Sequence, residues 1–225
     1  MKALFVLTSC SEIKTVGMKT GWYLPEVAHP YEVFTKAGVQ VDFVSPNGGM
    51  APMDPGSAEA FKDDAVCKAF LANETAMDAI ANTKTPAQVT PGEYKIIFYA
   101  GGHGPMFDLP DNVEIAKLAT AVYEAEGAVG AVCHGTVGLI PVKLSSGELL
   151  IKGLKLTSFT DAEEKAVNLD GAMPFLLETR LKELEAVFEG ADNFACNVQV
   201  SRRVVTGQNP ASATKTAEEL LKVAK

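Results

Sequence analysis

The hydrophobic and polar positions of this chain follow two different periods in turn. Continuous apolar or alternating runs of strand length are separated by segments with helical spacing. The strand candidates are 2–8, 39–45, 94–99, 128–132 and 154–159, with an edge hairpin over 197–205. The helix candidates are 22–37, 63–71, 74–81, 112–126, 174–188 and 211–224. Apolar strands that alternate with helices predict βαβ units, and therefore an α/β fold with a mostly parallel sheet sandwiched by helices.

Two loops of this predicted fold carry reactive residue types. Ligands of such folds bind outside the carboxyl ends of the strands. Gly101-Gly102-His103-Gly104 follows the strand at 94–99, and Cys133-His134-Gly135 follows the strand at 128–132. Because both loops lie at strand carboxyl ends, the sequence predicts a site there.

The second loop has the form of a nucleophile elbow, in which a buried strand turns sharply into a helix. Small residues two positions before and after the nucleophile, here Ala131 and Gly135, let the strained turn pack. A thiol at a helix N-terminus is expected to favour the thiolate. Cys133 is therefore the candidate nucleophile, although free cysteines are also often buried structural residues.

Three further groups beside the elbow are candidates for polar roles. The backbone N–H of His134 is expected to donate to an oxyanion, while its imidazole is left open as the base. The glycine-rich loop at Gly102 is the expected second half of the oxyanion hole. His103 is interpreted as a loop histidine satisfied by local hydrogen bonds rather than as a catalytic residue.

The carboxylates near these loops have two readings each. Glu26 is either a helix first-turn acid favoured by the dipole or a buried carboxyl beside the thiol. Asp161, Glu163 and Glu164 follow a strand, so one of them can orient a histidine, or all three can form a solvated helix start.

Length and charge exclude several classes of protein. The 225 residues fit a single domain, 1–225, with a hydrophobic fraction of 47% that is ordinary for a globular protein. The net charge of −8 argues against nucleic acid or an anionic membrane as the main partner. The apolar run at 3–7 is too short for a secretory signal, despite the lipobox-like Leu7-Thr8-Ser9-Cys10, and is better explained as a core strand.

The four cysteines are widely scattered along the chain. Their spacing suggests neither a structural zinc site nor a disulfide framework, so no metal is expected. Few, scattered cysteines indicate a reducing compartment, and we expect a cytoplasmic protein.

Taken in order, these residues resemble the ThiJ/PfpI superfamily, with its flavodoxin-like, class I glutamine amidotransferase-like fold. The similarity is greatest to the branch of heat-shock chaperones and glutathione-independent glyoxalases III. The matching segments are Lys19-Thr20-Gly21, Glu26 with His29-Pro30, 41–45, Gly102-His103-Gly104 with Phe107-Asp108, 131–135, Phe159-Thr160-Asp161 with Glu164, and 205–207 with 209–212.

The resemblance implies a role for each matching site residue. Cys133 would be the nucleophile, His134 its partner, Glu164 the acid that orients the histidine and Glu26 the acid that contacts the thiol. The amides of Gly102 and His134 would form the oxyanion hole. The segment 51–84 would form a helical cover near the site. The segment 167–194 matches the family weakly, which leaves the pocket shape undetermined.

The resemblance also implies an activity. We expect a glyoxalase III-type reaction that converts methylglyoxal or glyoxal to the 2-hydroxy acid through a cysteine hemithioacetal, without a cofactor. The expected partners are a small reactive aldehyde and a second copy of the chain in a homodimer, but neither nucleic acid nor membrane. The alternatives are a cysteine amidase or peptidase, a protein deglycase, and a stress-response holding chaperone or redox sensor.

Overall fold

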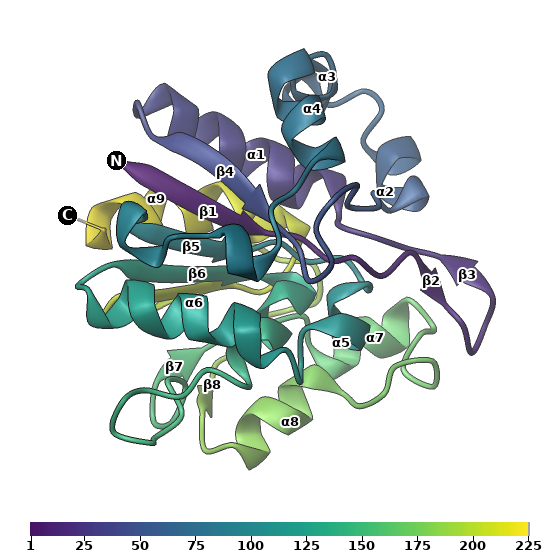
Figure 1. Cartoon of the computed structure of the whole chain (residues 1–225). Coiled ribbons are helices and arrows are strands. Elements are labelled where there is room, and N and C mark those ends of the chain that lie inside the picture. The colour runs from purple at the N-terminus through teal and green to yellow at the C-terminus, as the bar shows by residue number, and fades with distance from the viewer. Residues whose placement is uncertain (225) are drawn as a thin grey trace.

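Five parallel strands and one antiparallel edge strand form the central sheet of the computed structural model, which describes residues 1–224 (Figure 1). The strand order is β4-β1-β5-β6-β10-β9, and only the β9–β10 pair is antiparallel. The bounds are β1 Lys2–Val6, β4 Gln40–Val44, β5 Ile96–Tyr99, β6 Ala128–Val132, β9 Val198–Ser201 and β10 Val204–Gly207. The predicted α/β fold with a mostly parallel sheet is therefore confirmed.

Helices cover both faces of this sheet (Figure 1). Successive side chains of a strand point to opposite faces, so Leu4 belongs to one hydrophobic core and Phe5 to the other. The core that contains Leu4 includes residues of α6, and the core that contains Phe5 includes residues of α1 and α9. These helices span Leu24–Lys36 (α1), Val113–Glu124 (α6) and Ala213–Val223 (α9).

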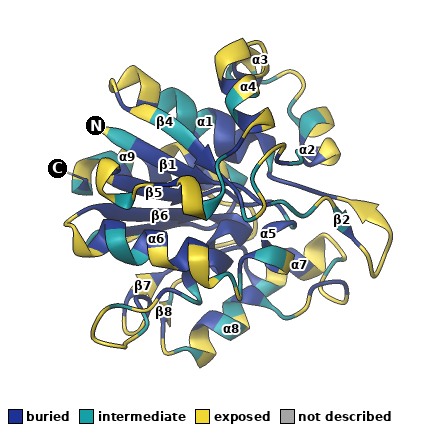
Figure 2. Ribbon diagram, viewed as in Figure 1, coloured by how far each residue is buried: buried dark blue, intermediate teal, exposed yellow. Residues whose placement is uncertain are grey.

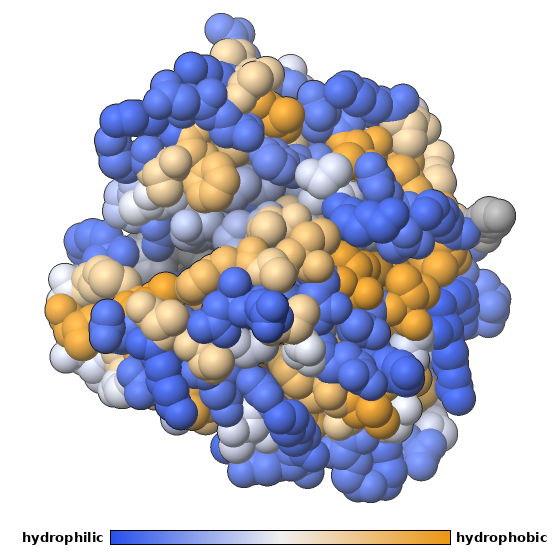
Figure 3. Space-filling view, turned by 180° about the vertical axis from the view of Figure 1, so that it is seen from behind, coloured by the Kyte–Doolittle hydropathy of each residue, from blue (hydrophilic) through white to orange (hydrophobic). Residues whose placement is uncertain are grey.

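Burial follows these layers. Figure 2 shows dark strands in the middle of the molecule and yellow outer faces on most helices. The opposite side, shown in Figure 3, has apolar side chains gathered in several places between polar ones. Within residues 1–224, no helix has both the length and the apolar character needed to cross a bilayer.

The segment 51–84 folds into three short helices. They are α2 (Pro55–Ala60), α3 (Ala65–Leu71) and α4 (Glu74–Ala81), and each starts at a side chain that accepts a backbone N–H: Asp54, Asp64 and Asn73. Of these helices, α2 and α3 contact α1, while α4 packs against α3 and β4. Phe61, just after α2, meets Tyr23 edge-on at 6.0 Å between ring centroids. Through Tyr23, which precedes α1, this segment reaches the functional site.

The region 154–188 differs from the prediction. The predicted strand 154–159 is reduced to β7 (Lys155–Leu156), and the predicted helix 174–188 is reduced to α8 (Leu177–Glu183). Glu185 has a left-handed backbone (φ 64°), which ends the helical path. The chain then extends as β8 (Val187–Phe188) and pairs in parallel with β7, outside the central sheet.

The hairpin of β2 (Glu12–Ile13) and β3 (Met18–Lys19) and the helix α5 (Pro105–Asp108) were not anticipated, since they are too short for a hydrophobic period to show. The helix α7 (Asp161–Ala166) begins where a solvated helix start was one reading, but Glu163 and Glu164 in it are buried. Both α5 and α7 directly follow loops that contribute to the site.

The turn after β6 has no room for a side chain at Gly135. A Cβ there would lie 2.4 Å from the Tyr99 carbonyl oxygen and 2.8 Å from the Ala100 carbonyl carbon, both backbone atoms. We therefore expect Gly135→Ala to lower the free energy of unfolding by about 1–3 kcal/mol in urea denaturation. Gly92→Ala is the control, because no atom lies within 4 Å of its added Cβ. Equal stability of the two variants would contradict the steric argument.

Candidate active site

Cys133 lies at a strained bend between β6 and the following 3₁₀ helix, η3 (Cys133–Leu139). Its backbone is left-handed (φ 58°), a conformation that costs a non-glycine residue on the order of 1–3 kcal/mol and is common at functional sites. The residue is only 4% exposed. The structure therefore has the elbow geometry at the carboxyl end of a central strand.

His134 and Glu164 extend from this cysteine as a hydrogen-bonded chain. The Cys133 Sγ lies 3.5 Å from His134 Nδ1, and His134 Nε2 lies 2.5 Å from Glu164 Oε2. Because a carboxylate only accepts, we assign the ring proton to Nε2, which leaves the Nδ1 lone pair facing the sulfur. The imidazole as well as the backbone of His134 is thus placed to serve the thiol.

The two ionisable partners in this chain have their pKa values moved downward. Burial, and then the charge of His103, lower the pKa of His134. Burial by itself would raise the pKa of Glu164, but His134 and His103 outweigh it and bring the pKa to about 2. A neutral imidazole beside an ionised carboxylate is a combination suited to accepting a proton from a thiol.

Glu26 approaches the thiol from the opposite side, from the first turn of α1. It is completely buried, and burial raises its pKa to about 8. Cys133 and the Gly101 amide lie close enough to offset part of that rise, yet no group in residues 1–224 makes a hydrogen bond of ordinary geometry to its oxygens. At neutral pH Glu26 is therefore mainly an uncharged acid beside the sulfur.

The space between Glu26 and Cys133 requires glycine at position 101. A Cβ on Gly101 would lie 2.5 Å from Glu26 Oε2 and 2.9 Å from the Cys133 Cβ. Any side chain here would push the carboxyl away from the thiol.

The expectation of a resting thiolate at Cys133 is wrong. Burial, followed by the charge of Glu26, raises the thiol pKa well above its usual value, and the nearby His134 amide only partly opposes this. The 3₁₀ helix that begins at Cys133 does not compensate for the solvation that the buried sulfur loses. The resting sulfur therefore carries its proton at neutral pH.

The glycine-rich loop after β5 faces the elbow. Gly102 has a backbone (φ 98°) that favours glycine, and a Cβ there would lie 2.2 Å from the Gly21 carbonyl oxygen. Gly102 and Cys133 line the same cavity of about 130 Å³. The amides of Gly102 and His134 are thus candidates for holding an oxyanion there.

Several cavity residues were not anticipated from the sequence. The apolar part of the wall consists of Tyr23, Phe159, Val167, Phe194 and Pro210. Val167 and Phe194 lie at the two ends of the segment whose family similarity is weak. Their position beside the other lining residues follows only from the tertiary fold, and no motif marks them.

His103 was expected to form local hydrogen bonds, but its partner is 61 residues away. Its Nε2 lies 2.8 Å from Glu164 Oε1, and its ring centroid lies 4.3 Å from that of His134. Cys10, in contrast, lines a separate and larger hollow with Asp108.

The acids that neighbour Glu164 point elsewhere. Asp161 accepts from the Thr179 hydroxyl at 2.5 Å. Glu163 accepts from the Phe194 amide at 2.7 Å and from the Asn209 side-chain amide at 2.9 Å. Of the three candidate acids, only Glu164 reaches a histidine.

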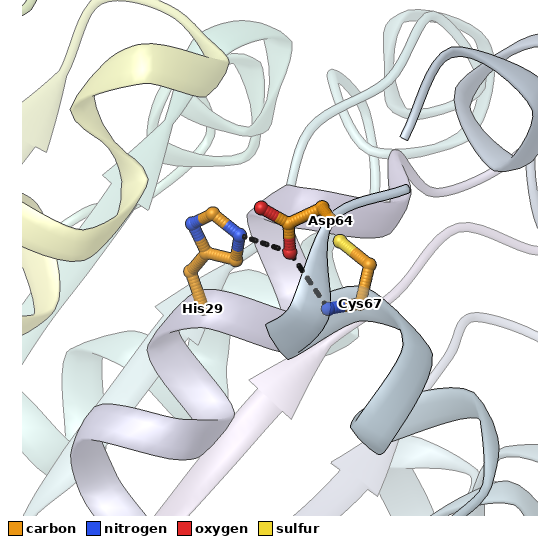
Figure 4. Close-up of side chains that lie close together, drawn as sticks. All are labelled: His29, Asp64 and Cys67. Atoms are coloured by element: carbon orange, nitrogen blue, oxygen red, sulfur yellow. Dashed lines mark hydrogen bonds and ion pairs between the residues drawn. The ribbon is translucent and has the colours of Figure 1, made fainter. Parts of the chain in front are cut away.

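Two groups of side chains in residues 1–224 have ligand atoms close enough together to hold a metal ion. One is His103, His134 and Glu164, so a cation there would compete with the proton chain. The other is His29, Asp64 and Cys67, on α1 and at the start of α3, where Asp64 accepts from His29 Nε2 at 3.1 Å and from the Cys67 amide at 2.8 Å (Figure 4). That no metal takes part in function stays a prediction.

Comparisons with known proteins identify relatives along almost the whole chain. A model described as the DJ-1/PfpI family matches residues 18–223. A Candida albicans protein named Glyoxalase 3 is 35% identical, covering 98% of this chain and 97% of its own length. The Saccharomyces cerevisiae Glutathione-independent glyoxalase HSP31 is 32% identical, covering 96% and 94%.

Solved structures show the same similarity. The Rapid Encystment Protein of 24 kDa from Francisella tularensis has a TM-score of 0.95 and 34% identity, covering 100% of this chain and 99% of its own. Glyoxalase III from Candida albicans has a TM-score of 0.91 and 32% identity, covering 99% and 97%.

The buried carboxyl of Glu26 leads to a stability prediction. Its pKa is 4.5 in the unfolded chain and about 8 in the folded protein, so between these values the folded form binds the extra proton. Folding stability is therefore lost as pH rises through that window. We expect Glu26→Gln to gain stability over the wild type as pH rises from 5 to 9, by on the order of several kcal/mol. Thermal denaturation at each pH measures this difference.

Glu32→Gln is the matched control, since this glutamate lies on the same helix with a side chain that is 38% exposed and pairs with Lys36 at the surface. A stability difference between wild type and Glu26→Gln that is the same at pH 5 and pH 9 would contradict the assignment of a raised pKa.

Proposed function

Since this chain belongs to the DJ-1/PfpI family, we propose that it is a glutathione-independent glyoxalase, which converts methylglyoxal or glyoxal to the corresponding 2-hydroxy acid. Relatives at 32–35% identity over most of the chain carry that activity in their names. The observation that carries the proposal is that Cys133, His134 and Glu26 line one small cavity, while Glu164 is hydrogen-bonded to His134.

The first step is addition of sulfur to the aldehyde carbon. The Cys133 thiol gives its proton to His134 Nδ1, which lies 3.5 Å from the sulfur, and a C–S bond forms as the carbonyl π pair moves to oxygen. The amides of Gly102 and His134 would stabilise that oxyanion. The product is a hemithioacetal.

The second step moves a hydrogen between the two substrate carbons. A base removes the proton from the carbon bound to sulfur, and the resulting enediolate is reprotonated at the neighbouring carbon. Glu26 first gives its acid proton to the oxygen of the hemithioacetal, which leaves it as a carboxylate. That carboxylate is suited to remove and return the carbon proton, because its pKa of about 8 allows both transfers near neutral pH. The outcome is a thioester on Cys133.

Hydrolysis of the thioester completes the reaction. Water adds to the acyl carbon, the C–S bond breaks, and the sulfur recovers its proton from the His134 imidazolium. The sum is methylglyoxal plus water giving lactate, so the internal oxidation of one carbon balances the reduction of its neighbour.

The size of the cavity favours a small aldehyde over the alternatives. Its volume of about 130 Å³ is well below the roughly 300–1,000 Å³ of pockets for drug-sized ligands. A peptide or a large amide would have to leave most of its length outside. A dicarbonyl of two or three carbons has no such difficulty.

The location and assembly of the protein are also proposals. We propose a cytoplasmic protein, supported by the four free cysteines, which are spread along the chain. We propose that it works as a homodimer, as the family resemblance implies, with the full chain of each copy acting as one catalytic unit. Light scattering of the protein as it elutes from a size-exclusion column measures its mass and so tests the dimer.

The activity is tested with purified protein and methylglyoxal in the absence of glutathione. We expect wild type to form lactate and Cys133→Ser to lose at least about 10³-fold in kcat, because the hydroxyl is a far poorer nucleophile in this site. Cys10→Ser is the control, since Cys10 lines a different hollow. Equal lactate formation by wild type and Cys133→Ser would contradict the mechanism.

A further inference from the structure

We propose that His103 is a positioning residue for this active site, a second hydrogen-bond donor that holds Glu164 in the orientation His134 requires. The inference rests on the proposed function for its turnover test, but not for its test on the thiol. The signal is a histidine outside the Cys133-His134-Glu164 chain whose ring faces the same carboxylate.

The two histidines each donate a hydrogen bond to a different oxygen of the Glu164 carboxylate. Glu164 Oε2 accepts from His134 Nε2, and Glu164 Oε1 accepts from His103 Nε2 at 2.8 Å. The two rings lie 4.3 Å apart between centroids and both line the cavity of Cys133. The carboxylate is therefore fixed at both oxygens by groups from different loops.

Removing His103 would leave a buried charge half satisfied. The Glu164 side chain is only 5% exposed, so water does not readily replace a donor at Oε1. A buried carboxylate oxygen that loses its partner carries the desolvation penalty, and rotation about the carboxyl bonds would then compete with the His134 contact. His103 thus fixes the orientation of Glu164, and Glu164 in turn fixes the orientation of the His134 ring.

His103 also influences the protonation of His134. Its positive charge, when present, opposes a second charge on the neighbouring ring and is one cause of the lowered His134 pKa. The other ionisable groups that face this pair are Glu164 on α7, Glu26 on α1, Cys133 on η3 and Tyr23 just before α1, and the charge of Glu163 lies nearby. Both glutamates of α7 raise the pKa of His134, whereas His103 lowers it.

Two substitutions separate the hydrogen bond from the charge. His103→Gln keeps an N–H donor of similar reach but carries no charge, and His103→Phe keeps a flat ring but has no donor. We expect His103→Phe to lose about 10–100-fold in kcat on methylglyoxal, with KM within about threefold, as for other groups that orient a catalytic residue. His103→Gln should retain kcat within about threefold of wild type at its pH optimum.

The second measurement is the rate at which iodoacetamide alkylates Cys133, followed on its own peptide by mass spectrometry as a function of pH. It reports the thiol, His134 and Glu164 without any substrate. In His103→Gln, where Glu164 keeps a donor, loss of the opposing charge raises the pKa of His134, so the acid limb of the profile should move to higher pH.

The matched control is His29→Phe. His29 is another half-buried histidine whose Nε2 meets a carboxylate, that of Asp64, but it does not line the cavity (Figure 4). Removing it should leave the alkylation profile of Cys133 unchanged. Circular dichroism and thermal denaturation establish that each variant is folded before its rates are compared.

The outcomes distinguish the alternatives. A fall in kcat for His103→Phe, its recovery in His103→Gln and the shifted acid limb support the positioning role. Wild-type kcat and profile in His103→Phe overturn it, and so does a His103→Gln variant as slow as His103→Phe. If wild type itself fails to convert methylglyoxal, the glyoxalase proposal falls, while the alkylation profiles still decide the role of His103.

Discussion

The active site depends above all on the left-handed backbone of Cys133. This bend turns the sulfur out of the sheet toward Glu26 and the His134 ring, and it is possible only because the neighbouring chain approaches without side chains in the way. Gly101 and Gly135 leave that space on the two sides. The strain is a cost to folding that the packed sheet around β6 offsets, since every residue of that strand is buried.

The two glutamates beside this bend, Glu26 and Glu164, have very different pKa values. Burial raises the pKa of Glu26, whereas two histidines lower the pKa of Glu164. Two carboxyl groups of the same kind are thereby placed in opposite protonation states at neutral pH. In the mechanism that we propose, Glu26 gives a proton to the reacting centre, and Glu164 stabilises positive charge on His134 as the thiol reacts.

The sequence predicted the layers of this fold more completely than its connections. Apolar strands such as β1 and β6 are long enough to show their period, but β7 and β8 are two residues each and pair only in the folded molecule. The elbow could be predicted because its motif spans only a few consecutive residues. The contact of His103 with Glu164 could not be predicted, since it joins positions 61 residues apart.

Burial also explains why the sequence misjudged the thiol. The residues next to Cys133 in the chain indicate a helix start, which favours a thiolate, whereas Glu26 approaches from a helix about a hundred residues earlier. The pattern of neighbouring residues in the sequence predicts the backbone conformation around a nucleophile. The electrostatic surroundings come from elements that only the tertiary structure brings near.

The two consecutive glutamates on α7, Glu163 and Glu164, hold different parts of the site. Glu164 faces the histidines, while Glu163 holds the Phe194 amide and Asn209. Val167 and Phe194, at the two ends of the segment 167–194, both border the cavity. A different side chain at either position would alter which molecules enter, while the reacting groups keep their places.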